Sequence, residues 1–196
     1  MEKLIVISAP DMFPGEHELI NRMFASGLGL LHLRKPGWDV ASMMNLLDKI
    51  DNAFHNRIAV HQHHDAARDY GIRRLHFPER ERHRLTTAEA VACSASVHSI
   101  AAYKELDSVF SYAFYSPVFK SISKKEHTAT IDMTEVSGMT RHISMVALGG
   151  IDRHNCLIPF RHGFDSVAVL GAIWETPDPL DAFKNIQVCI TTDPQC

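Results

Sequence analysis

Short apolar runs recur along the chain and alternate with segments whose apolar residues have helical spacing. Runs of this length are typical of strands that are buried on both faces, as in a parallel sheet covered by helices. They predict strands over residues 4–8, 30–34, 57–61, 73–77, 92–96, 109–114, 144–151 and 164–174. Helices are predicted over 16–25, 40–53, 65–70, 99–106, 132–139, 153–162 and 178–188, and polar loops over 78–87 and 116–130.

This alternation predicts a parallel sheet, because parallel neighbours need crossover connections and helices supply them. Eight strands favour closure, so we predict an α/β protein that forms one (β/α)8 TIM barrel, with residues 1–196 as a single domain. The alternative is an open flavodoxin-like sheet, which normally has fewer strands. The sequence contains no internal repeat, no low-complexity tract and no linker rich in Gly, Ser or Pro.

Composition and charge narrow the classes of function. The chain has 196 residues, of which 45% are hydrophobic, and a net charge of −3. This balance gives no electrostatic argument for nucleic acid, and no basic run or long apolar stretch indicates a membrane. The N-terminal residues do not resemble a signal peptide, and the four cysteines have no Cys-x-x-Cys spacing. We therefore expect a cytoplasmic protein with free thiols.

Polar and charged side chains gather where the predicted strands end. They are Ser8, His32, Arg34, His61, Gln62, His76, Glu79, Ser96, His98 and Ser116. In a (β/α)8 barrel these strand ends ring one mouth, where active sites lie. Any one of the histidines is equally well explained as a satisfied polar group near a strand end. Arg34 is the most informative, because a guanidinium can bind a phosphate or diphosphate through two parallel hydrogen bonds.

The last two predicted strands both end in glycine, at Gly149-Gly150 and at Leu170-Gly171. Glycine lets the backbone approach a bound group, and free N–H groups at a following helix favour an anion. In (β/α)8 barrels the loops after these two strands, with a short extra helix, often bind phosphate. The pattern predicts such a pocket here; the alternative is two core strands with glycines in ordinary turns.

Two other segments carry candidate chemistry. Residues 121–125 offer two hydroxyl groups and two ammonium groups, which suit a lid over an anion, although such lysines are also common as solvated charges. Residues 61–65 (His-Gln-His-His-Asp) suggest a transition metal, but adjacent residues cannot all supply the coordination geometry. We expect His63, His64 and Asp65 to begin a helix, and we do not predict a zinc site from this segment.

Several motifs, taken in order, resemble the thiamine phosphate synthase family, which includes the related thiazole tautomerases. The matching pieces are His32-Leu-Arg-Lys-Pro36, Leu75-His-Phe77, Ser96-Val-His-Ser99, Ser116-Pro-Val-Phe-Lys-Ser-Ile-Ser-Lys124, Ala147-Leu-Gly-Gly-Ile151 and Val167-Ala-Val-Leu-Gly-Ala-Ile173. The resemblance runs from the first predicted strand to about Leu180. No single motif is decisive, but the ordered series is specific to the family.

The resemblance implies a barrel transferase of thiamine biosynthesis that couples hydroxymethylpyrimidine diphosphate to thiazole phosphate, releasing diphosphate with the help of Mg²⁺. Its catalytic residues here would be Arg34, Ser96 and Lys124, which would hold the pyrimidine diphosphate. The substrate site would also include His32, His61, Ser121, Ile122, Ser123, Gly149, Gly150, Leu170 and Gly171, the last seven around the thiazole phosphate. The implied partners are small phosphorylated heterocycles, and a homo-oligomer is compatible with the sequence.

The chain departs from the family pattern at positions that matter for chemistry. Pro36 stands where the pattern has Lys, and Gln62 stands where it has an Asp metal ligand, which leaves Glu81 as the expected carboxylate. Gln62 and Glu81 are therefore the candidate ligands of a weak or altered Mg²⁺ site, since hard Mg²⁺ prefers carboxylate oxygen. Pro117 stands where the tautomerases have His. The alternatives are a diverged enzyme acting on a related phosphorylated heterocycle, a thiazole tautomerase-like isomerase, and a non-catalytic barrel that binds phosphate or thiamine precursors.

Overall fold

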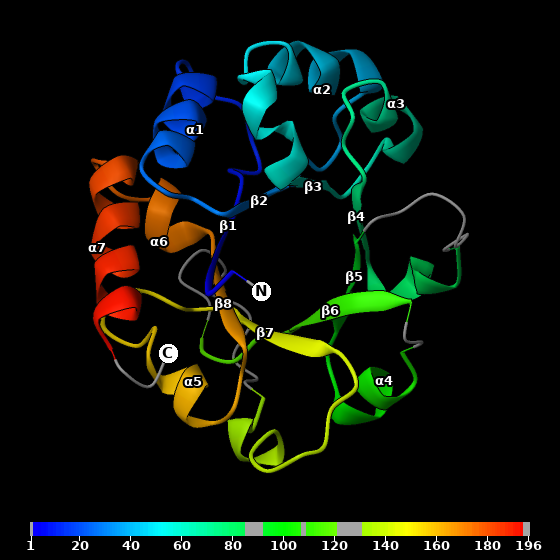
Figure 1. Cartoon of the computed structure of the whole chain (residues 1–196), viewed down its shortest axis with the longest axis vertical. Helices are drawn as coiled ribbons and strands as arrows, with labels where there is room; N and C mark the ends of the chain where they lie inside the picture. Colours follow the sequence, from blue (N-terminus) through cyan, green and yellow to red (C-terminus); the bar gives the residue numbers. More distant parts are fainter. Residues whose placement is uncertain (1, 85–91, 107–108, 121–130, 194–196) are drawn as a thin grey trace.

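The computed structural model describes residues 2–84, 92–106, 109–120 and 131–193, in which parallel strands close into a barrel in the order β1 to β8 (Figure 1). Each strand pairs with the next, and β8 returns to pair with β1. The strands are β1 (Leu4–Ile7), β2 (Leu30–Leu33), β3 (Ile58–Val60), β4 (Arg74–Phe77), β5 (Ala92–Val97), β6 (Phe110–Tyr115), β7 (Ser144–Leu148) and β8 (Ser166–Val169). The predicted TIM barrel is confirmed, and the open-sheet alternative is wrong.

Helices surround the strands on the outside of the barrel (Figure 1). The α-helices are α1 (Glu16–Ala25), α2 (Val40–Leu47), α3 (His64–Arg68), α4 (Ile100–Lys104), α5 (Ile158–Arg161), α6 (Gly171–Trp174) and α7 (Pro179–Thr192). Three 3-10 helices, η1 (Asn52–Arg57), η2 (Glu79–Arg84) and η3 (Met133–Glu135), complete the described segments. None of the helices in the described ranges is long and apolar enough to cross a membrane.

Alternate residues of each strand belong to two different cores. Ile5 and Ile7 of β1 pack inside the barrel with Tyr112, Phe114 and others, whereas Leu4 and Val6 join the larger layer between the strands and the helices. Successive side chains of a strand point to opposite faces, so both sets are buried and the strands read as continuous apolar runs. The same alternation decides which polar residue of each strand points inward.

Three predicted helices are shorter in the structure because polar side chains start new turns within them. The helix expected over 40–53 ends at Leu47, and the Asp51 carboxylate then accepts from the Ala53 N–H to begin η1. In the segment 132–139 only η3 forms, and Gly138 adopts a φ of +73°. In the segment 153–162 the Asp152 carboxylate accepts from the His154 N–H, so α5 is confined to Ile158–Arg161. Such local bonds compete with the helical ladder. The loop expected over 78–87 contains η2 instead.

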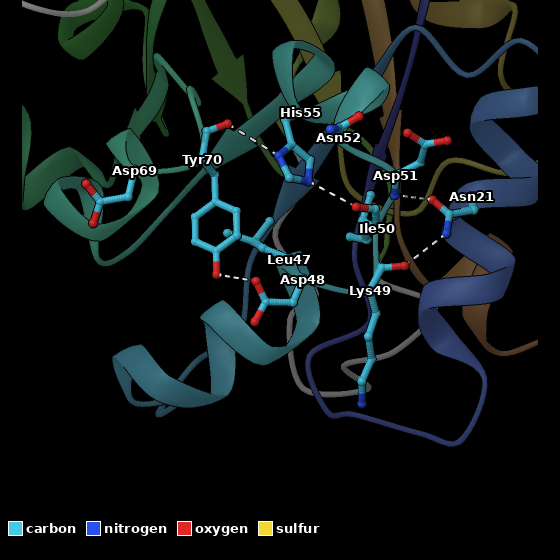
Figure 2. Close-up of a pocket in the computed structure, with 10 residues that line it drawn as sticks. All are labelled: Asn21, Leu47, Asp48, Lys49, Ile50, Asp51, Asn52, His55, Asp69 and Tyr70. Atoms are coloured by element: carbon cyan, nitrogen blue, oxygen red, sulfur yellow. Dashed lines mark hydrogen bonds between the residues drawn. The ribbon is translucent and has the colours of Figure 1, made fainter.

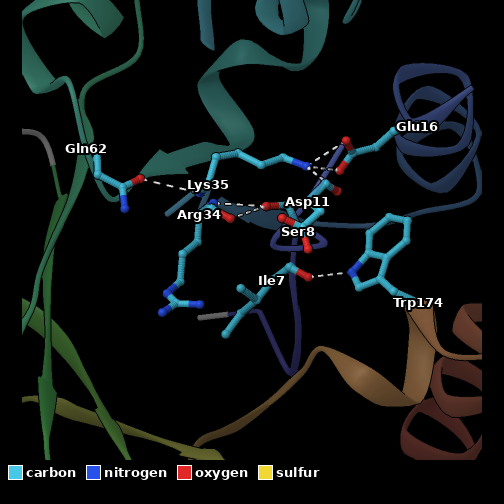
Figure 3. Close-up of polar contacts among 8 residues, drawn as sticks. All are labelled: Ile7, Ser8, Asp11, Glu16, Arg34, Lys35, Gln62 and Trp174. Atoms are coloured by element: carbon cyan, nitrogen blue, oxygen red, sulfur yellow. Dashed lines mark hydrogen bonds and ion pairs between the residues drawn. The ribbon is translucent and has the colours of Figure 1, made fainter. Parts of the chain in front are cut away.

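Two hydrogen bonds fix the seam where the barrel closes. The Ser166 hydroxyl donates to the Glu2 carbonyl at 2.6 Å, and the indole N–H of Trp174 donates to the Ile7 carbonyl at 2.7 Å (Figure 3). The second bond ties α6, the short extra helix after β8, to the C-terminal end of β1. The loop after β8 is thereby held beside the mouth of the barrel.

Candidate functional site

The C-terminal mouth of the barrel holds a cavity of about 760 Å³. Its size is within the usual range for small-molecule sites, and its location is where TIM barrels bind substrates. The polar and glycine residues that line it come from the ends of β2 to β8 and the loops that follow: Arg34, Gly37, His61, Gln62, His76, Glu79, Arg80, Ser96, His98, Ser116, Gly149, Gly150 and Gly171.

Arg34 is one of two arginines that line this cavity, and its backbone is fixed from both sides. The Arg34 N–H donates to the Ser8 hydroxyl at 2.9 Å, and that hydroxyl donates to the Arg34 carbonyl at 3.0 Å (Figure 3). No hydrogen bond or ion pair is recorded for the guanidinium itself within the described ranges. A half-buried cation that has no partner in the described part of the chain, and that lies at the mouth of a cavity, is suited to binding an anion.

Lys35, the next residue, is directed away from the cavity and is nearly fully buried. Its ammonium group donates to both carboxylate oxygens of Glu16 on α1, at 2.5 and 2.6 Å (Figure 3). The same group lies 4.8 Å from the centre of the Trp38 ring. Burial raises the pKa of Glu16 and lowers the pKa of Lys35, while the hydrogen bond between them opposes both shifts. The charge of Lys35 therefore stabilises the junction of β2 with α1 and does not contribute to the site.

A cluster of histidines forms the floor of the cavity. His32 is fully buried, its Nδ1 lies 3.0 Å from His61 Nε2, and its Nε2 lies 2.7 Å from the Tyr112 hydroxyl. The His61 and His76 rings stack with their centres 4.0 Å apart. His76 contacts the Ser94 and Ser96 hydroxyls, each at 2.9 Å. The side chains come from β2, β4, β5, β6 and the residue directly after β3.

Burial is the largest cause of the shifted pKa values in this cluster. Burial lowers the pKa of His32 and of His61 well below the usual value, and the neighbouring imidazoles lower them further. The pKa of His76 falls to about 3, from burial first and then from the charges of His64 and Arg34. Burial also raises the pKa of Tyr112 to about 12. All three imidazoles are therefore neutral at physiological pH.

The two glycine strand ends meet on the other side of the cavity. Gly149 and Gly150 have φ values of +106° and +64°, a region that favours glycine. A Cβ atom on Gly150 would meet the Lys120 carbonyl oxygen, so the loop after β6 packs directly against this turn. No hydrogen bond is recorded for the N–H of Gly150 or of Gly171 inside the described segments. Both donors border the cavity and are available to a phosphate.

The predicted site residues fall into three groups. Eight of them line the cavity: Arg34, His61, Gln62, Ser96, Gly149, Gly150, Leu170 and Gly171. Ser121, Ile122, Ser123 and Lys124 lie outside the described residues. His32 and Glu81 do not line the cavity: His32 lies beneath it against His61, and Glu81 belongs to η2, where its carboxylate pairs with exposed Arg80 at 3.2 Å. The prediction missed Arg80 at the mouth, Tyr112 beneath it and the contact between the three histidines.

The described residues do not fit the magnesium site that the resemblance implies. Among them Glu79 is the only carboxylate that lines the cavity, and it lies 3.9 Å from His98 Nε2. The Gln62 amide oxygen accepts from the Lys35 N–H at 3.4 Å, and Glu81 lies outside the lining. Mg²⁺ requires hard oxygen ligands, usually carboxylates. A protein-held Mg²⁺ at Gln62 and Glu81 therefore has no support from the described geometry.

A second hollow lies on the outside of the barrel, between α1, α2, η1 and α3 (Figure 2). Its polar groups bind one another: the Tyr70 hydroxyl donates to the Asp48 carboxylate at 2.6 Å, and the Asn21 amide bonds to the backbone of Lys49 and Asp51 (Figure 2). These contacts join the outer elements together. The barrel mouth is therefore the stronger candidate for a ligand site.

Comparisons with known proteins agree with the geometry. A family model described as thiamine monophosphate synthase matches residues 4–173. The thiamine-phosphate synthase of Laribacter hongkongensis is 26% identical over 167 residues, which cover 79% of this chain and 78% of that protein. The crystal structure of thiamine phosphate pyrophosphorylase from Bacteroides thetaiotaomicron matches with a TM-score of 0.76 and 26% identity, over 98% of this chain and 99% of that one. The Pyrococcus furiosus thiamine phosphate pyrophosphorylase has a TM-score of 0.77 at 19% identity, over 96% and 95% of the two chains, which shows the shared fold.

Proposed function

This chain belongs to the thiamine monophosphate synthase family, and we propose that it is a transferase that couples hydroxymethylpyrimidine diphosphate to thiazole phosphate. In this reaction the bond between the pyrimidine-bearing carbon and the diphosphate breaks, and the thiazole takes the place of the diphosphate. The observation that carries the proposal is the Arg34 guanidinium, which has no partner among the described residues and borders the same cavity as the glycine turns at Gly150 and Gly171.

Arg34 is assigned to the diphosphate. Ionisation of the pyrimidine–diphosphate bond concentrates negative charge on the leaving group, so a fixed cation beside it stabilises the transition state more than the ground state. The Ser8 hydroxyl holds the Arg34 backbone in place, and Ser96 lines the same cavity as a hydroxyl donor. Lys124, the third member assigned by the resemblance, lies outside the described residues.

The thiazole phosphate is assigned to the glycine turns after β7 and β8. The N–H groups of Gly150 and Gly171 border the cavity, and the positive φ at Gly149 and Gly150 brings the backbone close to a bound group. Two separate anion sites in one cavity are what a reaction between two phosphorylated heterocycles requires. The His61 and His76 rings lie on the floor between the strand ends, where they can contact an aromatic heterocycle.

A second candidate is a barrel that binds these phosphorylated compounds without turnover. It is favoured by the single carboxylate, Glu79, in the described lining and by Pro36, which borders the cavity where the family pattern has Lys. Calorimetry with each compound, beside a steady-state assay with both and Mg²⁺, separates the two candidates. Binding of both compounds with no product at any Mg²⁺ concentration supports the binding barrel and contradicts the synthase.

The Arg34 assignment is tested by replacing the guanidinium with an ammonium. Arg34→Lys keeps the charge but loses the planar fork, so kcat/KM should fall about 10- to 100-fold, equivalent to roughly 1.4–2.7 kcal/mol. Arg73→Gln is the matched control, since Arg73 is an exposed cation next to the opposite end of β4 and should leave the rate unchanged. Equal rates for Arg34→Lys and the wild type would contradict the assignment of Arg34 to the diphosphate.

A further inference from the structure

We propose that His32, His61 and His76 form a binding site for a zinc-class transition metal on the floor of the cavity. Within the described ranges they are the group of histidine, cysteine and acidic side chains whose ligand atoms converge, all within 4.8 Å of one another. They come from β2, the residue after β3, and β4, whereas the segment 61–65 contributes only one ligand. The inference goes beyond the proposed synthase activity and does not depend on it.

The distances require only a modest rearrangement around an ion, in which His32 and His61 separate slightly and His76 moves inward. Zinc binds imidazole nitrogen at about 2.0–2.1 Å, so two nitrogens on a tetrahedral ion are roughly 3.3 Å apart. His32 Nδ1 and His61 Nε2 are already 3.0 Å apart in the metal-free structure. The ion would replace the hydrogen that the two rings share. A nitrogen of His76, within 4.8 Å of both, moves inward to complete three ligands.

The groups behind the rings match those that orient metal-binding histidines. Such histidines usually donate their second N–H to a fixed acceptor, which sets the tautomer and aims the free nitrogen at the metal. His32 Nε2 meets the Tyr112 hydroxyl at 2.7 Å, and His76 Nδ1 meets the buried Ser94 hydroxyl at 2.9 Å. The other His76 nitrogen contacts Ser96, which borders the cavity and is free to turn towards it.

Metal binding needs only a rearrangement of the protons that the three imidazoles already carry. A neutral imidazole carries one N–H, and His61 must present Nε2 to the metal. Its proton then moves to Nδ1, which has no partner recorded in the described part of the chain. Two hydrogen bonds, between His32 and His61 and between His76 and Ser96, are replaced by coordinate bonds, and no net proton is released from these rings.

The ligand set selects the metal, and the position of His61 provides an open site. Three neutral nitrogens favour Zn²⁺, Co²⁺, Ni²⁺ or Cu²⁺ over Mg²⁺, which prefers oxygen. Three protein ligands leave a fourth position for water or a ligand, as in zinc sites that take part in chemistry. His61 and His76 line the cavity, so this position faces the space that also contains Arg34. A bound metal would add positive charge beside the proposed phosphate sites.

Cobalt titration tests the proposal in the wild-type protein. Co²⁺ added to the chelator-treated full chain should bind at one ion per chain and produce the strong visible absorption of tetrahedral cobalt, and Zn²⁺ should displace it. ¹⁵N NMR of the imidazoles should show three metal-bound nitrogens under Zn²⁺, whether or not any variant folds. Absence of tetrahedral absorption, or imidazole signals unchanged by Zn²⁺, would overturn the proposal.

Three variants locate the site. His32→Gln and His61→Asn replace an imidazole ligand by a neutral amide, and each should weaken Zn²⁺ binding at least tenfold. His98→Gln is the matched control, because His98 borders the same cavity but bonds to the Ser116 carbonyl at 2.8 Å instead of joining the cluster. Zinc affinity that survives the combination of His32→Gln with His61→Asn, or that falls equally in His98→Gln, contradicts the assignment. All readouts are metal binding, so they do not depend on the synthase assay.

Discussion

The buried histidine cluster predicts a steep loss of stability in mild acid, and His76 allows its size to be worked out. The pKa of His76 is about 3 in the folded protein, against about 6.5 in an unfolded chain. Below pH 6.5 the unfolded state therefore binds a proton that the folded state does not. The contribution of His76 to the free energy of unfolding is therefore fully present above pH 6.5. It falls by about 1.4 kcal/mol for each pH unit between 6.5 and the pKa of the folded state. At pH 5 the cost from His76 alone is about 2 kcal/mol, a large part of the 5–15 kcal/mol typical of a domain.

The assay is urea unfolding followed by circular dichroism between pH 7.5 and pH 5, with chelator present to exclude metals. Other titrating groups contribute to the slope in every variant, so the informative quantity is the difference between wild type and His76→Gln. His76→Gln should be less stable than the wild type at pH 7.5, but its free energy of unfolding should depend less on pH. The difference between the two proteins should therefore shrink by about 2 kcal/mol by pH 5.

Phe114→Leu is the matched control for this measurement. Phe114 is buried beside the same cluster, with its ring centre 4.6 Å from that of His32 and 5.2 Å from that of His76. The substitution weakens the packing without removing a titrating group, so its stability difference should be constant with pH. A wild-type minus His76→Gln difference that is also constant would refute the conclusion that burial keeps His76 neutral.

Three further predictions follow from individual contacts. Lys35→Met should cost about 3–5 kcal/mol in urea unfolding because it leaves the Glu16 carboxylate buried and unpaired, and adding Glu16→Leu should restore most of the loss. Gly150→Ala should destabilise the protein by more than Gly37→Ala, since both have positive φ but only the Gly150 site meets backbone atoms of the loop after β6; equal melting temperatures would contradict this. Gln62→Asp should raise Mg²⁺ affinity measured by calorimetry, because it adds a charged oxygen ligand at the cavity, and an unchanged affinity would exclude this position as a metal ligand.

The contact at Gly150 changes how the phosphate pocket must be tested. A larger side chain there would displace the loop after β6 whether or not phosphate binds nearby, since its Cβ would meet the Lys120 carbonyl oxygen and Phe119. A bulky substitution such as Gly150→Val therefore confounds phosphate binding with loop packing. The thiazole phosphate is better assessed by direct calorimetry on the wild type, with inorganic phosphate as competitor.

The barrel was predictable from the sequence because its strands are continuous apolar runs with polar residues at their ends. The boundaries of α2, α5 and η3 were not, because Asp51, Asp152 and Asp132 form side-chain hydrogen bonds to nearby backbone N–H groups. The helical spacing of apolar residues alone does not reveal such competition. Errors of this kind moved helix ends on the outside of the barrel and left the mouth unaffected.

The candidate site was predictable only in part. The alternation of inward and outward side chains can be read within one strand, whereas the register between strands depends on the whole sheet. Alternation along β2 places Arg34 on the inner face with His32 and places Lys35 outside, a distinction that the residue types alone conceal. The convergence of His32, His61 and His76 depends on how three strands are staggered, with His32 opposite Ala59 and His76 opposite Ser94. That stagger arises from closure of the whole barrel, so no single segment of the sequence contains it.

The two residues after β3 change which ions the cavity can bind. Gln62 stands where the family pattern has Asp, so this position has no carboxylate, while its neighbour His61 places an imidazole next to His32. The described lining then contains the cations Arg34 and Arg80 against the single carboxylate Glu79, and is suited to anions before any metal is counted.

A diphosphate can bring its own Mg²⁺ to such a cavity without protein carboxylates. The histidine cluster beneath would take a different ion through different atoms. Under this arrangement the Mg²⁺ dependence of the rate and the binding of Zn²⁺ by the protein are separate properties. A chelator selective for zinc should therefore remove the bound Zn²⁺ and leave unchanged the Mg²⁺ concentration that gives half-maximal rate.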